Sequence, residues 1–147
     1  DAYILAAGAP ILPTLGIADG LRVGPDVTPF WDREERSIMM NDGSWPCTRN
    51  AIRTVVHRLW LSQLIEIDPD VAFFRTKFNL LDDKQKLYLQ ALAHITKFKS
   101  TSDPIEWLDK SEKSTLINFM GRNSKVIQRT RYVFEVDGKI INFGDIL

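Results

Sequence analysis

The stretch Gly20-Leu21-Arg22-Val23-Gly24-Pro25-Asp26-Val27 reads as a short apolar strand that carries an arginine and ends in a carboxylate. Because side chains alternate across a strand, Arg22, Gly24 and Asp26 share one face. In an extended chain the two charged groups stand roughly 13 Å apart, too far for a salt bridge, so each is expected to face something else. Pro25 cannot donate to a sheet ladder, so we expect the strand to end there and to deliver Asp26 to a loop at its C-terminal end. Parallel sheets carry their chemistry at that edge.

Strands and helices alternate on either side of this stretch. Apolar runs predict strands at residues 3–7, 21–24, 64–68 and 98–101, the first of them buried on both faces. Helical spacing predicts helices over 50–61 and 110–120 and a further helix, capped by Asp82, that runs to about residue 95, with a loop over 31–46. This order is typical of an α/β fold in which helices cover a parallel sheet.

The C-terminal segment differs in kind. Residues 131–136 and 139–143 flank Asp137-Gly138, a strong signal for an antiparallel hairpin. We therefore expect two units, an α/β part over residues 1–122 and the beginning of a β-domain over 123–147.

Composition excludes several classes of function. The 147 residues are 44% hydrophobic and 26% charged, as in an ordinary globular domain. Lys and Arg together number 19 and so do Asp and Glu, which argues against nucleic acid or a membrane as partner. One cysteine and two histidines allow no internal disulfide and favour no zinc site, so we expect no metal or cofactor and a reducing, cytoplasmic location. The chain begins at Asp1, which suggests a processed or excised piece of a longer polypeptide.

Six motifs, in this order, resemble the glycoside hydrolase family 36 α-galactosidases. They are Ala7-Gly8-Ala9-Pro10, the run from Gly16 to Asp26, Pro29-Phe30-Trp31, Arg49-Asn50-Ala51-Ile52, Asp68-Pro69-Asp70 and Ser102-Asp103. The family's catalytic domain is a (β/α)8 barrel followed by a β-domain. The resemblance therefore implies the second half of that barrel, strands five to eight, plus the first hairpin beyond it.

The resemblance also implies a retaining hydrolysis of an α-galactoside or related α-glycoside by two carboxylates about 5 Å apart. Asp26 matches the family's general acid/base, and its neighbours from Val27 to Trp31 are expected to exclude water from it. Arg22 matches an arginine that contacts the sugar. Trp31 follows Asp26 by five residues, so we expect it to contact the sugar as well. From pattern alone, Arg22 and Asp26 serve equally well to satisfy the polar ends of a sheet.

Two departures from the family pattern bear on the substrate. Ala7, before Gly8 at the expected sugar site, replaces a cysteine that lies near the sugar's second hydroxyl. The smaller side chain leaves room for a 2-acetamido group on the sugar. We therefore expect the substrate to be a glycoside of galactose, of N-acetylgalactosamine or of another sugar. Asp70 matches a position close to the substrate, but Ile65-Glu66-Ile67 replaces Trp-Leu-Asn before it and weakens the expected sugar packing. In an alternative interpretation, Asp68 and Asp70 simply cap loop amides around Pro69.

The nucleophile of this family stands in a Lys-x-Asp context that this chain lacks, so we expect the chain alone to be inactive. A half-barrel exposes strand edges, which predicts binding to the missing N-terminal half or self-association as a homo-oligomer. Two other functions remain open. One is a standalone carbohydrate-binding or assembly module derived from the barrel half, and the other is an unrelated α/β enzyme that binds Mg²⁺ through Asp68 and Asp70.

Overall fold

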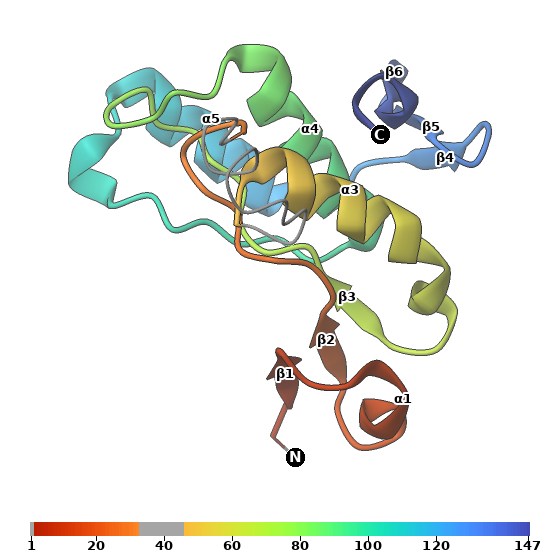
Figure 1. The fold of residues 1–147 in the computed structure, drawn as a ribbon. Helices are drawn as coiled ribbons and strands as arrows, with labels where there is room; N and C mark the ends of the chain where they lie inside the picture. Colours follow the sequence, from red (N-terminus) through yellow and green to blue (C-terminus); the bar gives the residue numbers. More distant parts are fainter. Residues whose placement is uncertain (1, 33–45) are drawn as a thin grey trace.

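The computed structural model describes residues 2–32 and 46–147. A three-stranded parallel sheet is formed by strands from its first 68 residues (Figure 1). Its strands, in their order in the sheet, are β1 (Leu5–Ala7), β2 (Gly20–Arg22) and β3 (Glu66–Asp68). Ala7 pairs with Arg22, and Arg22 pairs with Asp68. The last residues of three neighbouring strands therefore lie in one row at the carboxyl edge of the sheet.

One strand prediction is wrong in part, and another is wrong altogether. β1 is not buried on both faces, since Leu5 is 40% exposed, because β1 is an edge strand of the described sheet. Residues 98–101 form no strand. A backbone hydrogen bond from Ala72 N to Ser100 O, 2.9 Å long, ties this segment to the loop after β3 without a ladder. The parallel sheet of alternating β and α elements is confirmed for its first three strands.

The three predicted helices are present within a few residues of their expected ends. They are α3 (Thr48–Arg58), α4 (Asp83–Thr96) and α5 (Lys110–Gly121). Asp82 caps α4 in a capping box with Gln85, as the sequence predicted. Short helical turns, which were not predicted, occur at α1 (Ile11–Thr14), η1 (Leu59–Gln63), η2 (Ile105–Trp107) and η3 (Phe143–Ile146). Throughout residues 2–32 and 46–147, no helix has both the length and the apolar character needed to cross a bilayer.

The predicted hairpin is confirmed, and a third strand joins it. The antiparallel sheet has the order β4 (Val126–Gln128), β5 (Val133–Val136) and β6 (Lys139–Asn142). Asp137 and Gly138 both have positive φ, 50° and 83°, as a type I′ turn requires. β4 was missed because its three residues carry no clear alternation.

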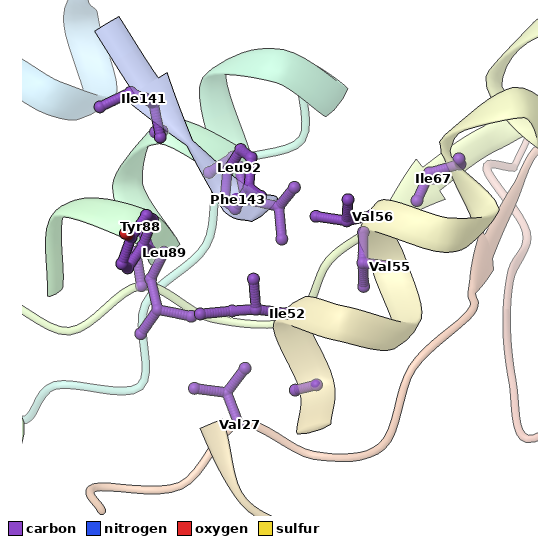
Figure 2. Close-up of a cluster of buried hydrophobic side chains, with 14 of the residues drawn as sticks. Val27, Ile52, Val55, Val56, Ile67, Tyr88, Leu89, Leu92, Ile141 and Phe143 are labelled. Carbon is purple, nitrogen blue, oxygen red and sulfur yellow. The ribbon is translucent and has the colours of Figure 1, made fainter. Parts of the chain in front are cut away.

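One hydrophobic core joins the helices to both sheets, as Figure 2 shows. Ile52 of α3, Leu92 of α4 and Phe143 after β6 are almost completely buried in it. Ile67 brings β3 to the same cluster, and Val27 brings the loop after β2. The core thus crosses the expected division near residue 122, and the division into two units stays a prediction. Most of the expected loop over 31–46 lies outside the described residues.

Candidate functional site

Arg22 lies at the centre of three carboxylates at the carboxyl edge of the parallel sheet. Its Nε is 2.9 Å from Asp68 Oδ2, its Nη2 is 2.9 Å from Asp70 Oδ1, and its Nη1 is 3.6 Å from Asp26 Oδ1. Each carboxylate ends or follows a strand, so the strand register brings together residues as far apart in the chain as Arg22 and Asp70. This group of four residues is called the Arg22 cluster below.

The expectation that Arg22 and Asp26 stand too far apart to interact is wrong. The strand ends at Arg22 itself, three residues earlier than Pro25, and the chain bends at Gly24. Gly24 passes against α3, where an added Cβ would lie 3.2 Å from Val55 Cγ2 and 3.3 Å from the carbonyl oxygen of Ala51. The chain therefore bends along the helix, and the bend returns Asp26 to Arg22.

Asp68 and Asp70 do cap loop amides, and they bind Arg22 at the same time. The Asp68 carboxylate is fully buried, and its Oδ1 accepts from the Asp70 amide at 2.7 Å. Asp70 Oδ2 accepts from the Val27 amide, also at 2.7 Å. Burial raises the pKa of Asp70, and the Val27 amide and the Arg22 charge partly oppose that rise. The capping interpretation is therefore confirmed, and a contact of Asp70 with the substrate stays a prediction.

Asp26 is the exposed member of the Arg22 cluster, with 74% of its side chain open to solvent. The expectation that its apolar neighbours exclude water from it is wrong for the described residues. Val27 turns into the core instead, and Trp31 stacks on Tyr88 with ring centroids 6.4 Å apart. Asp26 is thus a solvent-accessible carboxyl group beside a fixed cation, an arrangement that can exchange a proton with a bound ligand.

Ala7 ends β1 beside Arg22, with which it pairs across the sheet, and Gly8 follows it. Gly8 has a φ of +66° and no atom within 4 Å of an added Cβ, so it ends the strand in open space. A surface depression of about 550 Å³ lies here, lined among others by Gly8, Arg22, Gly24, Asn50 and Arg58. The structure therefore brings together Ala7, Gly8, Arg22, Asp26 and Asp70, and it puts Trp31 against Tyr88.

Sequence reasoning missed a second buried ion pair on the loop after β3. Arg75 Nη1 lies 2.8 Å from Asp103 Oδ1, and Oδ2 of that aspartate accepts from the amides of Phe74 and Arg75. Trp107 covers the Arg75 guanidinium at 5.2 Å. Asp103 therefore orients the loop that follows Asp70. The Ser102-Asp103 motif was the available signal, whereas nothing in the sequence around Arg75 indicated its partner.

The Arg22 cluster does not suit a divalent cation. Arg22 already occupies the position between the carboxylates, and its positive charge repels a metal ion there. Within the described part of the chain, no group of three or more His, Cys, Asp or Glu residues is arranged to hold a metal. The chemistry of this donor set therefore favours an acid and a cation acting on a polar ligand.

No protein-family model matches the chain. Among solved structures, it is similar over 100% of its length to an α-galactosidase from Thermus thermophilus in complex with p-nitrophenyl α-D-galactopyranoside, with 48% identity and a TM-score of 0.97. A second structure of that enzyme, in complex with stachyose, matches 83% of the chain with 54% identity and a TM-score of 0.80. The chain spans 31% and 27% of those two chains. The resemblance to α-galactosidases inferred from the sequence is confirmed.

Proposed function

We propose that this chain, a close structural relative of one segment of an α-galactosidase, forms the acid/base side of a retaining glycosidase active site. The observation that carries the proposal is the Arg22 cluster, in which an exposed carboxyl group, Asp26, stands beside a held arginine at the carboxyl edge of a parallel sheet. Glycosidases of this type use one carboxyl group as proton donor and a second as nucleophile. Asp26 is the donor in this proposal.

The fold supports assignment to the second half of a (β/α)8 barrel. Sequential parallel strands β1, β2 and β3, with α3 and α4 following β2 and β3, have the order that such a barrel repeats. Residues 1–122 are proposed to belong to this half-barrel and residues 123–147 to the start of a following β-domain. In a closed barrel of this kind, the active site gathers at the carboxyl ends of the strands, which is the edge where the Arg22 cluster lies.

In the proposed reaction, Asp26 donates its proton to the glycosidic oxygen while a second carboxylate attacks the anomeric carbon. The leaving alcohol departs, and a covalent glycosyl-enzyme remains. Asp26, now ionised, then takes a proton from water, whose oxygen attacks the anomeric carbon and releases the second carboxylate. The resemblance implies that this second carboxylate stands in a Lys-x-Asp motif, which the 147 residues do not contain.

Arg22 suits a contact with a sugar hydroxyl. A guanidinium has more N–H donors than its three carboxylate contacts require, and those contacts fix its plane. The other proposed substrate contacts come from the strand ends and from the loops that follow them, namely Ala7, Gly8 and Trp31. The substrate is an α-galactoside, in keeping with the ligands of the two Thermus thermophilus structures, or its 2-acetamido analogue if Ala7 leaves room for that group.

The first test compares the chain alone with the protein expressed from the complete reading frame. We expect the complete protein to hydrolyse p-nitrophenyl α-D-galactopyranoside and the 147-residue chain to release no more nitrophenol than buffer does. Asp26→Asn in the complete protein should lower kcat by at least about a hundredfold, as loss of a general acid does. Asp83→Asn, whose side chain is fully exposed on α4, is the matched control. An active chain, or an Asp26→Asn protein with unchanged kcat, overturns the proposal.

Association of the isolated chain is a second expectation. Leu5 of β1, together with Tyr3 and Ile4 just before it, leaves a half-exposed, largely apolar surface at the edge of the described sheet. Such an edge pairs readily with another strand. Sedimentation velocity should therefore show the chain alone as a dimer or larger species, and Leu5→Lys should shift it towards the monomer. A wild-type chain that sediments as a monomer at all concentrations contradicts this expectation.

A further inference from the structure

We propose that Asp70 is a positioning residue, which fixes the loop that carries Asp26 and so aligns the acid/base, in place of a direct contact with the sugar. This inference rests on the proposed function, because it assigns a role within that same site. It is carried by the partners of the Asp70 carboxylate, whose two oxygens reach the two ends of the segment between Arg22 and Val27.

One oxygen of Asp70 holds the backbone next to Asp26. Asp70 Oδ2 accepts a buried hydrogen bond from the Val27 amide at 2.7 Å. The Val27 side chain is itself buried in the core, so the residue after Asp26 is held at both its backbone and its side chain. A carboxylate that accepts a backbone amide makes a strong, directional contact, which limits the positions that Asp26 can take.

The other oxygen of Asp70 holds the cation that faces Asp26. Asp70 Oδ1 lies 2.9 Å from Arg22 Nη2, and Arg22 Nη1 lies 3.6 Å from Asp26 Oδ1. Asp70 therefore acts on Asp26 along two routes, through the Val27 amide and through the Arg22 guanidinium. Both routes end at the same carboxyl group.

The backbone of Asp70 is in turn fixed by its surroundings. Its φ of 73° lies in the left-handed region, which few residues other than glycine adopt and in which aspartate is enriched. Its amide donates to Asp68 Oδ1, and its carbonyl accepts from the Ser100 hydroxyl at 2.7 Å. Backbone held in this unfavourable region by several partners is typical of functional sites.

Burial separates the roles of Asp70 and Asp26. Asp70 is 6% exposed and both its oxygens have protein partners, whereas the Asp26 side chain is 74% exposed. Arg22 lines the surface depression and Asp26 is open to solvent beside Arg22, whereas Asp70 lies buried behind these two residues. The geometry favours Asp70 as a support for these two residues.

The test uses the complete protein and varies the leaving group. A 2,4-dinitrophenyl α-galactoside needs little protonation of its leaving oxygen, whereas methyl α-galactoside needs full assistance from the acid. We expect Asp70→Ala to lower kcat/KM about a hundredfold on the methyl glycoside, as misplacement of a reacting group by about 1 Å does. Because kcat/KM reports only the steps up to cleavage of the glycosidic bond, its loss on the dinitrophenyl glycoside should be at most about a tenth as large.

The isosteric Asp70→Asn keeps an oxygen for the Val27 amide and loses the charge that faces Arg22. The activity of Asp70→Asn on the methyl glycoside should therefore lie between that of the wild type and that of Asp70→Ala. The control Asp83→Asn should have the activity of the wild type on both glycosides. Equal losses on both substrates with a raised KM would show a direct sugar contact and overturn the positioning role. A wild-type protein that hydrolyses neither glycoside overturns the proposed function itself, which is a different result.

A second measurement does not depend on activity. Hydrogen exchange at the Val27 amide should be slow in the wild-type protein and at least about tenfold faster in Asp70→Asn, because the charged acceptor is lost. The control is the Gln85 amide, which donates to Asp82 at the cap of α4, outside the Arg22 cluster. It should exchange at the same rate in both proteins. Unchanged exchange at Val27 overturns the positioning role even if Asp70→Ala fails to fold.

Discussion

Arg22 Nε lies 2.9 Å from Oδ2 of Asp68, a carboxylate with no surface exposed to solvent. A buried carboxylate is tolerated only where a partner offsets the loss of its hydration. Arg22 supplies that partner from the neighbouring strand, where the register makes the two residues direct neighbours. The pair is therefore a structural requirement of this sheet as well as a part of the candidate site.

Replacement of Arg22 by methionine should destabilise the chain strongly. The variant leaves Asp68 buried without its cation, which costs about 3 kcal/mol in the free energy of unfolding. Arg129→Met is the matched control, since Arg129 pairs with Glu135 at the surface and its loss should cost less than about 1 kcal/mol. Urea denaturation of both variants measures the difference, and equal losses would contradict the argument.

The cap of α4 offers a second prediction. The Asp82 side chain accepts from the Gln85 amide at 2.7 Å, and Gln85 Oε1 accepts in turn from the Asp82 amide at 2.9 Å. Asp82→Ala should therefore lower the free energy of unfolding by about 1 kcal/mol. Asp83→Ala, one residue later and fully exposed, should change it by less than half as much. A larger effect at Asp83 than at Asp82 would contradict the capping argument.

Local signals in the sequence predicted most of the elements. The helix cap at Asp82, the Asp137-Gly138 turn and the runs that form β2 and β3 each depend on a few adjacent residues, and each is confirmed. The strand expected over 98–101 depended on a partner that its own residues do not specify. That segment meets a loop instead, and so it forms no ladder.

The residues of the Arg22 cluster could be singled out from the sequence, but their geometry could not be predicted from it. Sequence motifs singled out all four of them, namely Arg22, Asp26, Asp68 and Asp70. The contact between Arg22 and Asp26 depends on a bend at Gly24 against α3, and the sequence of the strand contains no information about that helix. The burial of Asp68 likewise follows from tertiary packing.

The turn between β5 and β6 gives a third prediction. Gly138 has a φ of +83°, where a Cβ is unfavourable even though nothing lies within 4 Å of it. Gly138→Ala should therefore cost about 1 kcal/mol in the free energy of unfolding, through backbone strain alone. Gly121→Ala, at the end of α5 with equally open surroundings and no positive φ, should be neutral or stabilise the chain by up to about 1 kcal/mol. Thermal unfolding of the two variants tests the contrast, which fails if both shift in the same direction by similar amounts.

His94 should make the stability of the chain depend on pH. Burial, followed by the charge of Lys99, lowers the pKa of His94 below its ordinary value of 6.5; Arg122 also lowers it and Asp137 opposes the shift. The unfolded chain therefore binds this proton at a higher pH than the folded chain does. The stabilising contribution of neutral His94 is fully present above about pH 6.5 and is lost as the pH falls through the lowered pKa.

His94→Gln removes this proton and tests the argument. Between about pH 6.5 and the lowered pKa, the wild-type chain should lose stability relative to His94→Gln, and the difference between the two should be constant above about pH 7. Denaturation with urea at a series of pH values measures that difference. The edge-to-face contact of His94 with Phe119, with centroids 4.9 Å apart, is lost in the variant at every pH, so it shifts the whole curve without changing its slope. A difference that does not vary with pH, or one that grows in favour of the wild type as the pH falls, contradicts the sign of the shift.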